Sequence, residues 1–157
     1  MTAPSFGLIR VLLAHKKSGE QALGRSRGGF TTKIHITVDA LGNPLRFRLS
    51  AGQRHDITCA FDLIEGLTFE RVIADRGYAA QSFVDYLTDR GVQAVIPPHQ
   101  RAKQPHEYDT WLYRERHLVE CFINKIKHFR RLFSRFEKLD RSYLGFLYFV
   151  GSLICLR

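Results

Sequence analysis

The sequence is poor in cysteine and has none of the spacings that hold zinc or a disulfide framework. Its 157 residues include three cysteines, Cys59, Cys121 and Cys155, which are widely spaced and odd in number. Free thiols of this kind are typical of cytosolic proteins. We therefore expect a cytoplasmic chain without disulfides, in which Cys121 is a buried thiol rather than a nucleophile.

Long apolar runs are also missing. The stretch 144–156 has 13 residues, whereas a membrane-spanning helix needs about 20. We interpret it as a buried C-terminal helix and expect no membrane partner. Residues 1–13 carry a single Arg and no convincing signal-peptide cleavage site, so we treat them as part of the fold. Because repeats and linkers are absent, residues 1–157 are predicted to form one domain.

Positive charge is abundant but unevenly distributed. The formal net charge is +9. Residues 1–35 hold six Lys or Arg against one acid, and residues 101–157 hold twelve against six, whereas residues 36–100 hold six against eight. This balance is expected if the basic ends bind a polyanion and the middle supplies carboxylates for a metal.

Strand-like and helix-like patterns alternate along the chain. Residues 33–38 and 45–49 alternate polar and apolar side chains around a turn-forming segment, which predicts a hairpin of half-buried strands. A helix that Asp56 caps and that runs through Glu65 is predicted next. The other predicted elements are strands at 71–74 and 92–96 and helices at 80–90, 113–133 and 142–156. Together they predict an α/β fold with a mixed sheet flanked by helices.

The segment 113–127 carries the most informative pattern. Tyr113, Arg116, Glu120 and Lys127 stand at offsets of 0, 3, 7 and 14, which places them within about 60° on one face of a helix. One carboxylate is thus held among basic and aromatic groups, which suits metal-assisted work on a phosphate backbone. The alternative is an ordinary solvated helix face with weak surface pairs.

A second carboxylate, Asp75, directly follows the predicted strand 71–74. Functional groups gather beyond the carboxyl ends of strands in open α/β sheets, but an Asp here could equally cap the next turn. Asp75 and Glu120 could together bind Mg²⁺, which takes oxygen ligands and often few protein carboxylates. Two such ions can activate the attacking oxygen and stabilise the leaving one in phosphodiester cleavage.

Several basic groups could bind phosphates, Arg through its planar fork and Lys as a point charge. A strip formed by Arg130, Arg131, Arg135 and Lys138 could also be a solvated helix end. A glycine-flanked loop at 24–29 could approach phosphates closely or be an ordinary surface loop. The predicted DNA-contacting residues are Tyr113, Arg116, Lys127, Arg130, Arg131, Arg25 and Arg27.

The Tyr–x2–Arg–x3–Glu–x6–Lys pattern resembles the signature of DDE transposases of bacterial insertion sequences. The likeness covers roughly residues 17–157 and is to the insertion sequence 5-like group. The matching stretches are Gly24-Arg25-Ser26-Arg27-Gly28-Gly29, Thr32-Lys33-Ile34-His35, Val38-Asp39-Ala40-Leu41-Gly42-Asn43-Pro44, Ala74-Asp75-Arg76-Gly77-Tyr78, Val95-Ile96-Pro97-Pro98 and residues 113–131.

This resemblance implies a ribonuclease-H-like fold in which two Asp and one Glu bind Mg²⁺ or Mn²⁺. Such enzymes hydrolyse DNA at transposon ends and join the freed 3′ ends to a target. By resemblance, Asp75 is the second Asp, Glu120 is the Glu, and Lys127 belongs to the catalytic set. The same resemblance implies a homo-oligomer that assembles on DNA.

The first Asp of that family has no evident counterpart here. The family places it on the opening strand, ahead of a segment that here is Lys17-Ser18-Gly19-Glu20-Gln21, and residues 1–13 hold neither Asp nor Glu. We therefore expect an N-terminally incomplete domain without a complete first strand. It could be a frameshift product, a pseudogene remnant, or a piece completed by an upstream transposase polypeptide.

Two functions follow from these observations. One is Mg-dependent DNA cleavage and strand transfer by a cytoplasmic, nucleoid-associated transposase. The other is a non-catalytic DNA-binding fragment or an inhibitor of transposition, which the missing Asp favours because two-metal binding should weaken without it.

Overall fold

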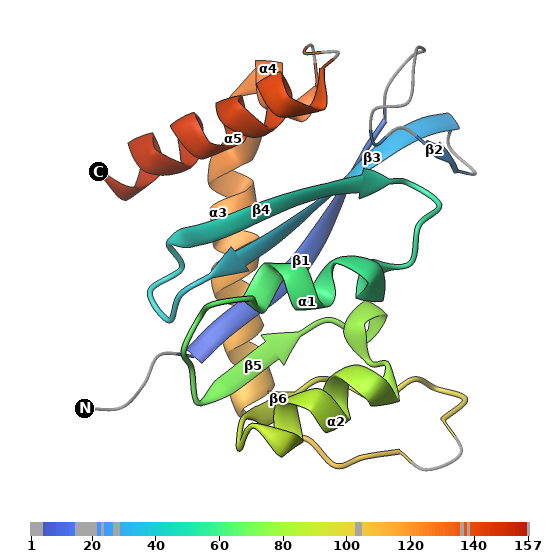
Figure 1. Ribbon diagram of the computed structural model, residues 1–157. Helices are drawn as coiled ribbons and strands as arrows, with labels where there is room; N and C mark the ends of the chain where they lie inside the picture. Colours follow the sequence, from blue (N-terminus) through green and yellow to red (C-terminus); the bar gives the residue numbers. More distant parts are fainter. Residues whose placement is uncertain are drawn as a thin grey trace.

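A mixed β-sheet forms the centre of the molecule (Figure 1). The computed structural model describes residues 5–14, 22, 24–26, 29–102, 105–135, 137 and 139–156, with the backbone alone for residues 5–14, 25, 26, 29, 30 and 133. β3 pairs antiparallel with β1, β2 and β4, whereas β1 with β5 and β5 with β6 are parallel pairs. The strands are β1 (Ser5–Ala14), β2 (Gly24–Ser26), β3 (Gly29–Val38), β4 (Pro44–Ala51), β5 (Arg71–Ala74) and β6 (Gln93–Val95).

Helices cover both faces of this sheet. α3 passes behind it in Figure 1, with α5 above, whereas α1 and α2 lie in front. The predicted mixed α/β fold is therefore confirmed. The helical elements are η1 (Asp56–Cys59), α1 (Ala60–Ile64), η2 (Arg76–Tyr78), α2 (Gln81–Asp89), η3 (Leu112–Arg116), α3 (His117–Lys127), α4 (Arg130–Phe133) and α5 (Asp140–Cys155), the η elements being 3-10 turns.

Two apolar clusters hold the helices on the sheet. The first joins one face of β3 and Phe47 of β4 to α3 and α5, and its buried α3 residues recur at the three-to-four spacing of an amphipathic helix. The second joins β5 to α1 and α2. The predicted inward residues of the helix at 80–90, Phe83, Val84 and Leu87, are all buried, as expected.

β3 is buried on both faces, which corrects the expectation of a half-buried strand. Its apolar side chains, such as Ile36, enter the first cluster. Its polar side chains Lys33, His35 and Thr37 point to the other face and are also buried, at 5%, 0% and 0% exposure. The alternation of polar and apolar residues in β3 therefore does not separate a buried face from an exposed one. Both faces are buried, and each of these polar groups has a buried partner.

Those partners come from η1 and α1, from η2 and from the neighbouring strand β4. The Lys33 ammonium donates to the Asp56 carboxylate at 2.9 Å, and the Thr37 hydroxyl donates to the Leu63 carbonyl at 2.9 Å. The two ring nitrogens of His35 lie 2.7 Å from the Tyr78 hydroxyl and 2.8 Å from the Ser50 hydroxyl. Buried polar groups are tolerated only with such partners, so β3 ties these segments to the sheet.

The predicted cap role of Asp56 is wrong. His55 occupies the N-cap position of η1, without a side-chain cap, and the Asp56 carboxylate turns inward to Lys33 instead. A buried ammonium needs a counter-charge more than a short 3-10 turn needs a side-chain cap. The helix itself is short, and Gly66 beyond its end has a positive φ of 70°.

The N-terminal segment corrects a second expectation, that the first strand is incomplete. Residues 5–14 form the ten-residue strand β1. It pairs with β3 from Gly7 to Ala14 and with β5 from Ser5 to Leu8, so backbone hydrogen bonds are available on both of its edges. The backbone of an apolar segment can complete the sheet although its sequence does not resemble the family's opening strand.

The predicted helix at 113–133 is not continuous. It divides into η3, α3 and α4, and the break falls at Phe129, whose φ of −89° and ψ of 85° are not helical. The turn that follows places Arg135 in the interior, where it is fully buried and bonded to Thr32 and Asp140. Arg135 is therefore not part of a phosphate-contact strip, and Lys138 lies outside the described residues.

The expectation about the cysteines is contradicted in part. Cys59 is buried, but Cys121 is exposed, so the predicted burial of Cys121 is wrong, since it lies on the side of α3 away from the core. Within the described residues, no helix combines the length and the apolar character needed to cross a bilayer.

We expect Phe47→Ala to lower the free energy of unfolding by about 3–5 kcal/mol, the usual cost of emptying such a site. Phe47 is 1% exposed and contacts the rings of Phe122 and Tyr148, so it joins α3 and α5 to the sheet. Phe149→Ala, at a side chain 58% exposed on α5, is the matched control and should cost less than about 1 kcal/mol. Urea denaturation measures both, and equal costs would contradict this packing.

Candidate active site

Asp75 lies directly beyond the carboxyl end of β5, as the sequence predicted. Its carbonyl accepts a hydrogen bond from the Tyr78 amide at 2.9 Å, which closes the turn η2. Although Asp75 occupies the N-cap position of that turn, its side chain makes no cap hydrogen bond. The alternative of a capping Asp is therefore not supported, and the carboxylate is directed to other partners.

Those partners come from the segment that starts α3. The Arg116 guanidinium donates to the Asp75 carboxylate at 2.9 Å and to the Glu120 carboxylate at 2.5 Å. The Tyr113 hydroxyl approaches the same oxygen of Asp75 at 3.4 Å. One guanidinium thus joins acids from a strand end and a helix that are 45 positions apart in the sequence. Because Asp75 and Arg116 are 29% and 26% exposed and Glu120 is 48% exposed, the group is open to a ligand.

Tyr113 responds to this surrounding charge. Partial burial raises the pKa of the Tyr113 hydroxyl, and the negative charge of Asp75 raises it further, whereas Arg116 lowers it. The phenol is therefore a neutral hydrogen-bond donor at neutral pH. Its ring also lies 5.7 Å from the Arg116 guanidinium carbon, within reach of a cation–π contact.

The other predicted site residues are not part of this group. Lys127 lies two turns beyond Glu120, about 10 Å along the helix axis, and its ammonium contacts Asn124 at 3.1 Å. Arg130 and Arg131 are exposed on α4, where Arg131 lies 3.6 Å from Glu137. The side chain of Arg25 and the whole of Arg27 lie outside the described residues.

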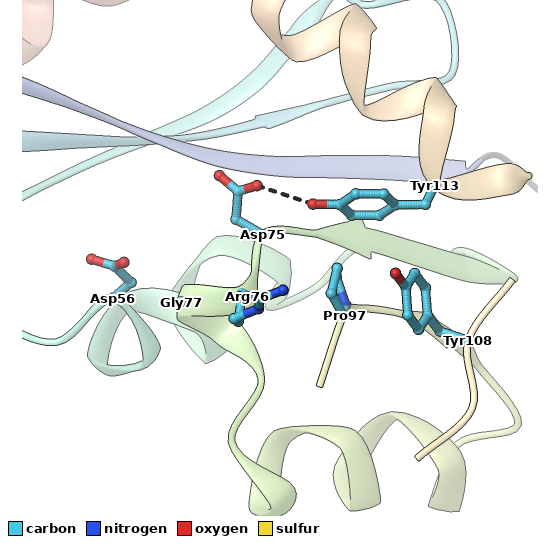
Figure 2. Close-up of a pocket in the computed structure, with 7 residues that line it drawn as sticks. All are labelled: Asp56, Asp75, Arg76, Gly77, Pro97, Tyr108 and Tyr113. Carbon is cyan, nitrogen blue, oxygen red and sulfur yellow. Dashed lines mark hydrogen bonds between the residues drawn. The ribbon is translucent and has the colours of Figure 1, made fainter. Parts of the chain in front are cut away.

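Asp75 opens into a cavity of about 390 Å³. Figure 2 shows the Tyr113 hydroxyl directed at Asp75 and Asp56 on the far side of that carboxylate. Asp75 and Tyr113 were predicted site residues, but sequence reasoning missed the other lining residues because nothing in their local pattern indicates that they meet. The available signals were that Arg76 and Gly77 follow Asp75 and that Pro97 lies in a stretch that resembles the family. The lining residues are Asp56, Asp75, Arg76, Gly77, Pro97, Tyr108 and Tyr113.

The site offers the type of ligand atom that a divalent cation prefers, but only a small number of such ligands. Asp75 and Glu120 offer the carboxylate oxygens that Mg²⁺ prefers. In the described part of the chain, no three His, Cys, Asp or Glu side chains gather in a group that could hold a metal ion. Asp56 shares the cavity with Asp75, but its charge is compensated by Lys33. The two acids on Arg116 are therefore the available ligands.

We expect Asp75→Asn to lower the pKa of Tyr113 and Arg116→Gln to raise it, because the first removes a negative charge and the second a positive one. Titration of tyrosine-labelled protein by NMR measures the shift, with Tyr113→Phe to assign the resonance. Because the folded pKa is raised above the unfolded value, this tyrosine contributes stability that is fully present below the unfolded pKa of about 10 and is lost as pH rises through the higher folded pKa. A shift of the same sign in both variants would contradict the arrangement.

Comparisons with known proteins show the family of this chain. Residues 7–153 match the family described as the transposase DDE domain. The chain is 38% identical over 131 residues to a protein of Brucella ovis named as a transposase for insertion sequence element IS6501, covering 81% of this chain and 99% of that protein. It is 34% identical over 151 residues to one of Burkholderia cepacia named for IS402, covering 88% of this chain and 68% of that protein.

Among the solved structures that are similar is that of the piggyBac transposase synaptic complex with hairpin DNA. The likeness has a TM-score of 0.46 and 8% identity, and it covers 66% of this chain and 24% of that one, which is too weak to decide the fold. The family match and the two sequence relatives are sufficient to assign the family. The chain belongs to the DDE transposases of bacterial insertion sequences.

Proposed function

We propose that this chain is the ribonuclease-H-like domain of an insertion sequence 5-like transposase, and that Asp75 and Glu120 are the carboxylates of its DNA cleavage site. The observation that carries the proposal is the single Arg116 guanidinium that joins both acids. The mixed sheet, with helices on both faces and Asp75 at the carboxyl end of a parallel strand, supports it.

Arg116 keeps the two carboxylates together in the absence of DNA. Its planar fork matches two phosphate oxygens as well as it matches carboxylates, so an incoming phosphodiester exchanges one set of acceptors for another. Tyr113 stays a neutral donor and offers its hydroxyl to the same phosphate. Mg²⁺ or Mn²⁺ held by Asp75 and Glu120 would supply charge neutralisation and activation of the attacking oxygen.

Cleavage by this chain should be weak, because no acid lies on β1, whose sequence is SFGLIRVLLA. Leu8 of β1 pairs with Ala74 of β5 in parallel register. The next residues along the two strands, Ile9 and Asp75, are therefore at matching positions. In a parallel pair, directly opposed residues share a face of the sheet. Position 9 is therefore where a carboxylate would stand beside Asp75, and this chain has an isoleucine there.

Without that acid, the chain should bind DNA but cleave it poorly. We propose the exposed Arg130 and Arg131, together with Lys127, as contacts to DNA phosphates. A homo-oligomer on DNA, in the cytoplasm at the nucleoid, is part of the same proposal. The competing function is a non-catalytic DNA-binding protein that occupies transposon ends. The absent acid favours it, and the next experiment separates the two.

We expect Ile9→Asp to raise Mg²⁺-dependent nicking of supercoiled plasmid by at least about tenfold, the scale on which residues of a metal site change activity. Ile9→Asn is the matched control, since it adds polarity without charge. Glu120→Gln, introduced into the Ile9→Asp protein, should abolish the gain.

Strong nicking by the unaltered chain that disappears in Glu120→Gln would mean that another group replaces the missing acid. Nicking that survives Asp75→Asn and Glu120→Gln would refute the assignment of the site.

Charge removal by Arg130→Gln and Arg131→Gln should reduce the salt dependence of DNA binding by about one unit of log–log slope for each lost contact. Fluorescence anisotropy of a labelled duplex at several NaCl concentrations measures the slope. Arg114→Gln, at another exposed side chain, is the control. An unchanged slope would remove α4 from the DNA interface.

A further inference from the structure

A second cavity adjoins the one that holds Asp75. Its volume is about 350 Å³, and its wall includes the basic side chains Lys33, Arg54, His55, Arg76 and His99, with Asp56 as an acid. Apart from Lys33, these residues lie within residues 36–100, where acids outnumber Lys and Arg. Tertiary structure thus gathers positive charge from a segment that is acidic on average.

Hydrogen bonds fix the loop that forms part of the wall of this cavity. The Lys33 ammonium donates to the Arg54 carbonyl at 2.5 Å as well as to Asp56 at 2.9 Å. The His55 carbonyl accepts from the amide and the hydroxyl of Thr58, at 3.2 and 2.7 Å. The loop that carries Arg54 and His55 is therefore preorganised, which lowers the entropic cost of binding.

The charge of the cavity is positive after internal pairs are counted. Lys33 compensates Asp56. In contrast, the exposed guanidinium groups of Arg54 and Arg76 make no ion pair or side-chain hydrogen bond with any residue that the structure describes. Two guanidinium groups without an ion pair that line one cavity are suited to an anion, and their planar forks match phosphate oxygens.

This cavity is continuous with the cleavage site. Asp56, Arg76 and Gly77 line both cavities. Gly77 allows its backbone to lie close to the Asp56 side chain, because a Cβ atom there would lie 2.3 Å from a carboxylate oxygen of Asp56. A polyanion bound at Asp75 can therefore continue past Arg76 to Arg54 along one surface.

We infer that the Arg54/Arg76 cavity binds a backbone phosphate of the DNA strand whose cleavable bond lies at Asp75. The inference rests on the proposed function, and it adds a phosphate subsite on the face of the sheet opposite to α3 and α5. Arg76 is the residue that links the subsite to the cleavage site, and Arg54 is its outer contact.

The test is DNA binding by the full chain as a function of salt, with Arg54→Gln and Arg76→Gln combined. Anisotropy of a fluorescein-labelled duplex at NaCl concentrations between about 50 and 300 mM gives the slope, which should fall by about two units for the two lost contacts. Arg54→Lys with Arg76→Lys should restore most of it. Arg141→Gln, at an exposed arginine of α5, should leave the slope unchanged.

Each other outcome has a distinct meaning. If the glutamine pair leaves the slope unchanged while Arg130→Gln and Arg131→Gln reduce it, the subsite inference is wrong and the proposed function stands. If the slope is unchanged but inorganic phosphate raises the melting temperature of the unaltered chain and not of the glutamine pair, the cavity takes free phosphate, which also overturns the inference. If the folded unaltered chain binds no DNA at any salt concentration, both proposals fail.

Discussion

The buried polar face of β3 is the constraint on which the site depends. Lys33 and His35 lie inside the molecule, at 5% and 0% exposure, and neither can stay there without partners. Lys33 binds Asp56 and the Arg54 carbonyl, and His35 binds the Tyr78 hydroxyl. These bonds fix the loop before α1 and the turn after β5, so the position of Asp75 is set by a strand that does not itself carry it.

The second important interaction is the bridge that Arg116 makes between Asp75 and Glu120. It balances negative charge that would otherwise repel at a half-exposed site, and it does so with a group that phosphate can also bind. The same three residues thus stabilise one another and, in the proposed function, are the groups that meet phosphate. The strand β1 is in place but its sequence holds no acid, so the proposed cleavage site has two carboxylates, Asp75 and Glu120.

Much of the fold was predictable because its elements have clear local signals. The strand 71–74 ends at Asp75, the helix near 80–90 has a regular inward face, and the C-terminal helix is long and apolar. The failures have a common cause in tertiary contacts. Asp56 resembles a cap but pairs with Lys33, the long helix breaks at Phe129, and β1 forms because strands on either side can pair with it.

The spacing of Tyr113, Arg116 and Glu120 by itself determined that these side chains share one face, since helix geometry is local. The family resemblance likewise depended on residues in sequence order alone. Only the tertiary structure decided that this face meets Asp75 and that Lys127 contacts Asn124 instead. It also decided that Arg54 and Arg76 line one cavity beside Asp75. Local patterns specify which residues lie together on an element, but the pairing of buried charges across elements decides which elements meet.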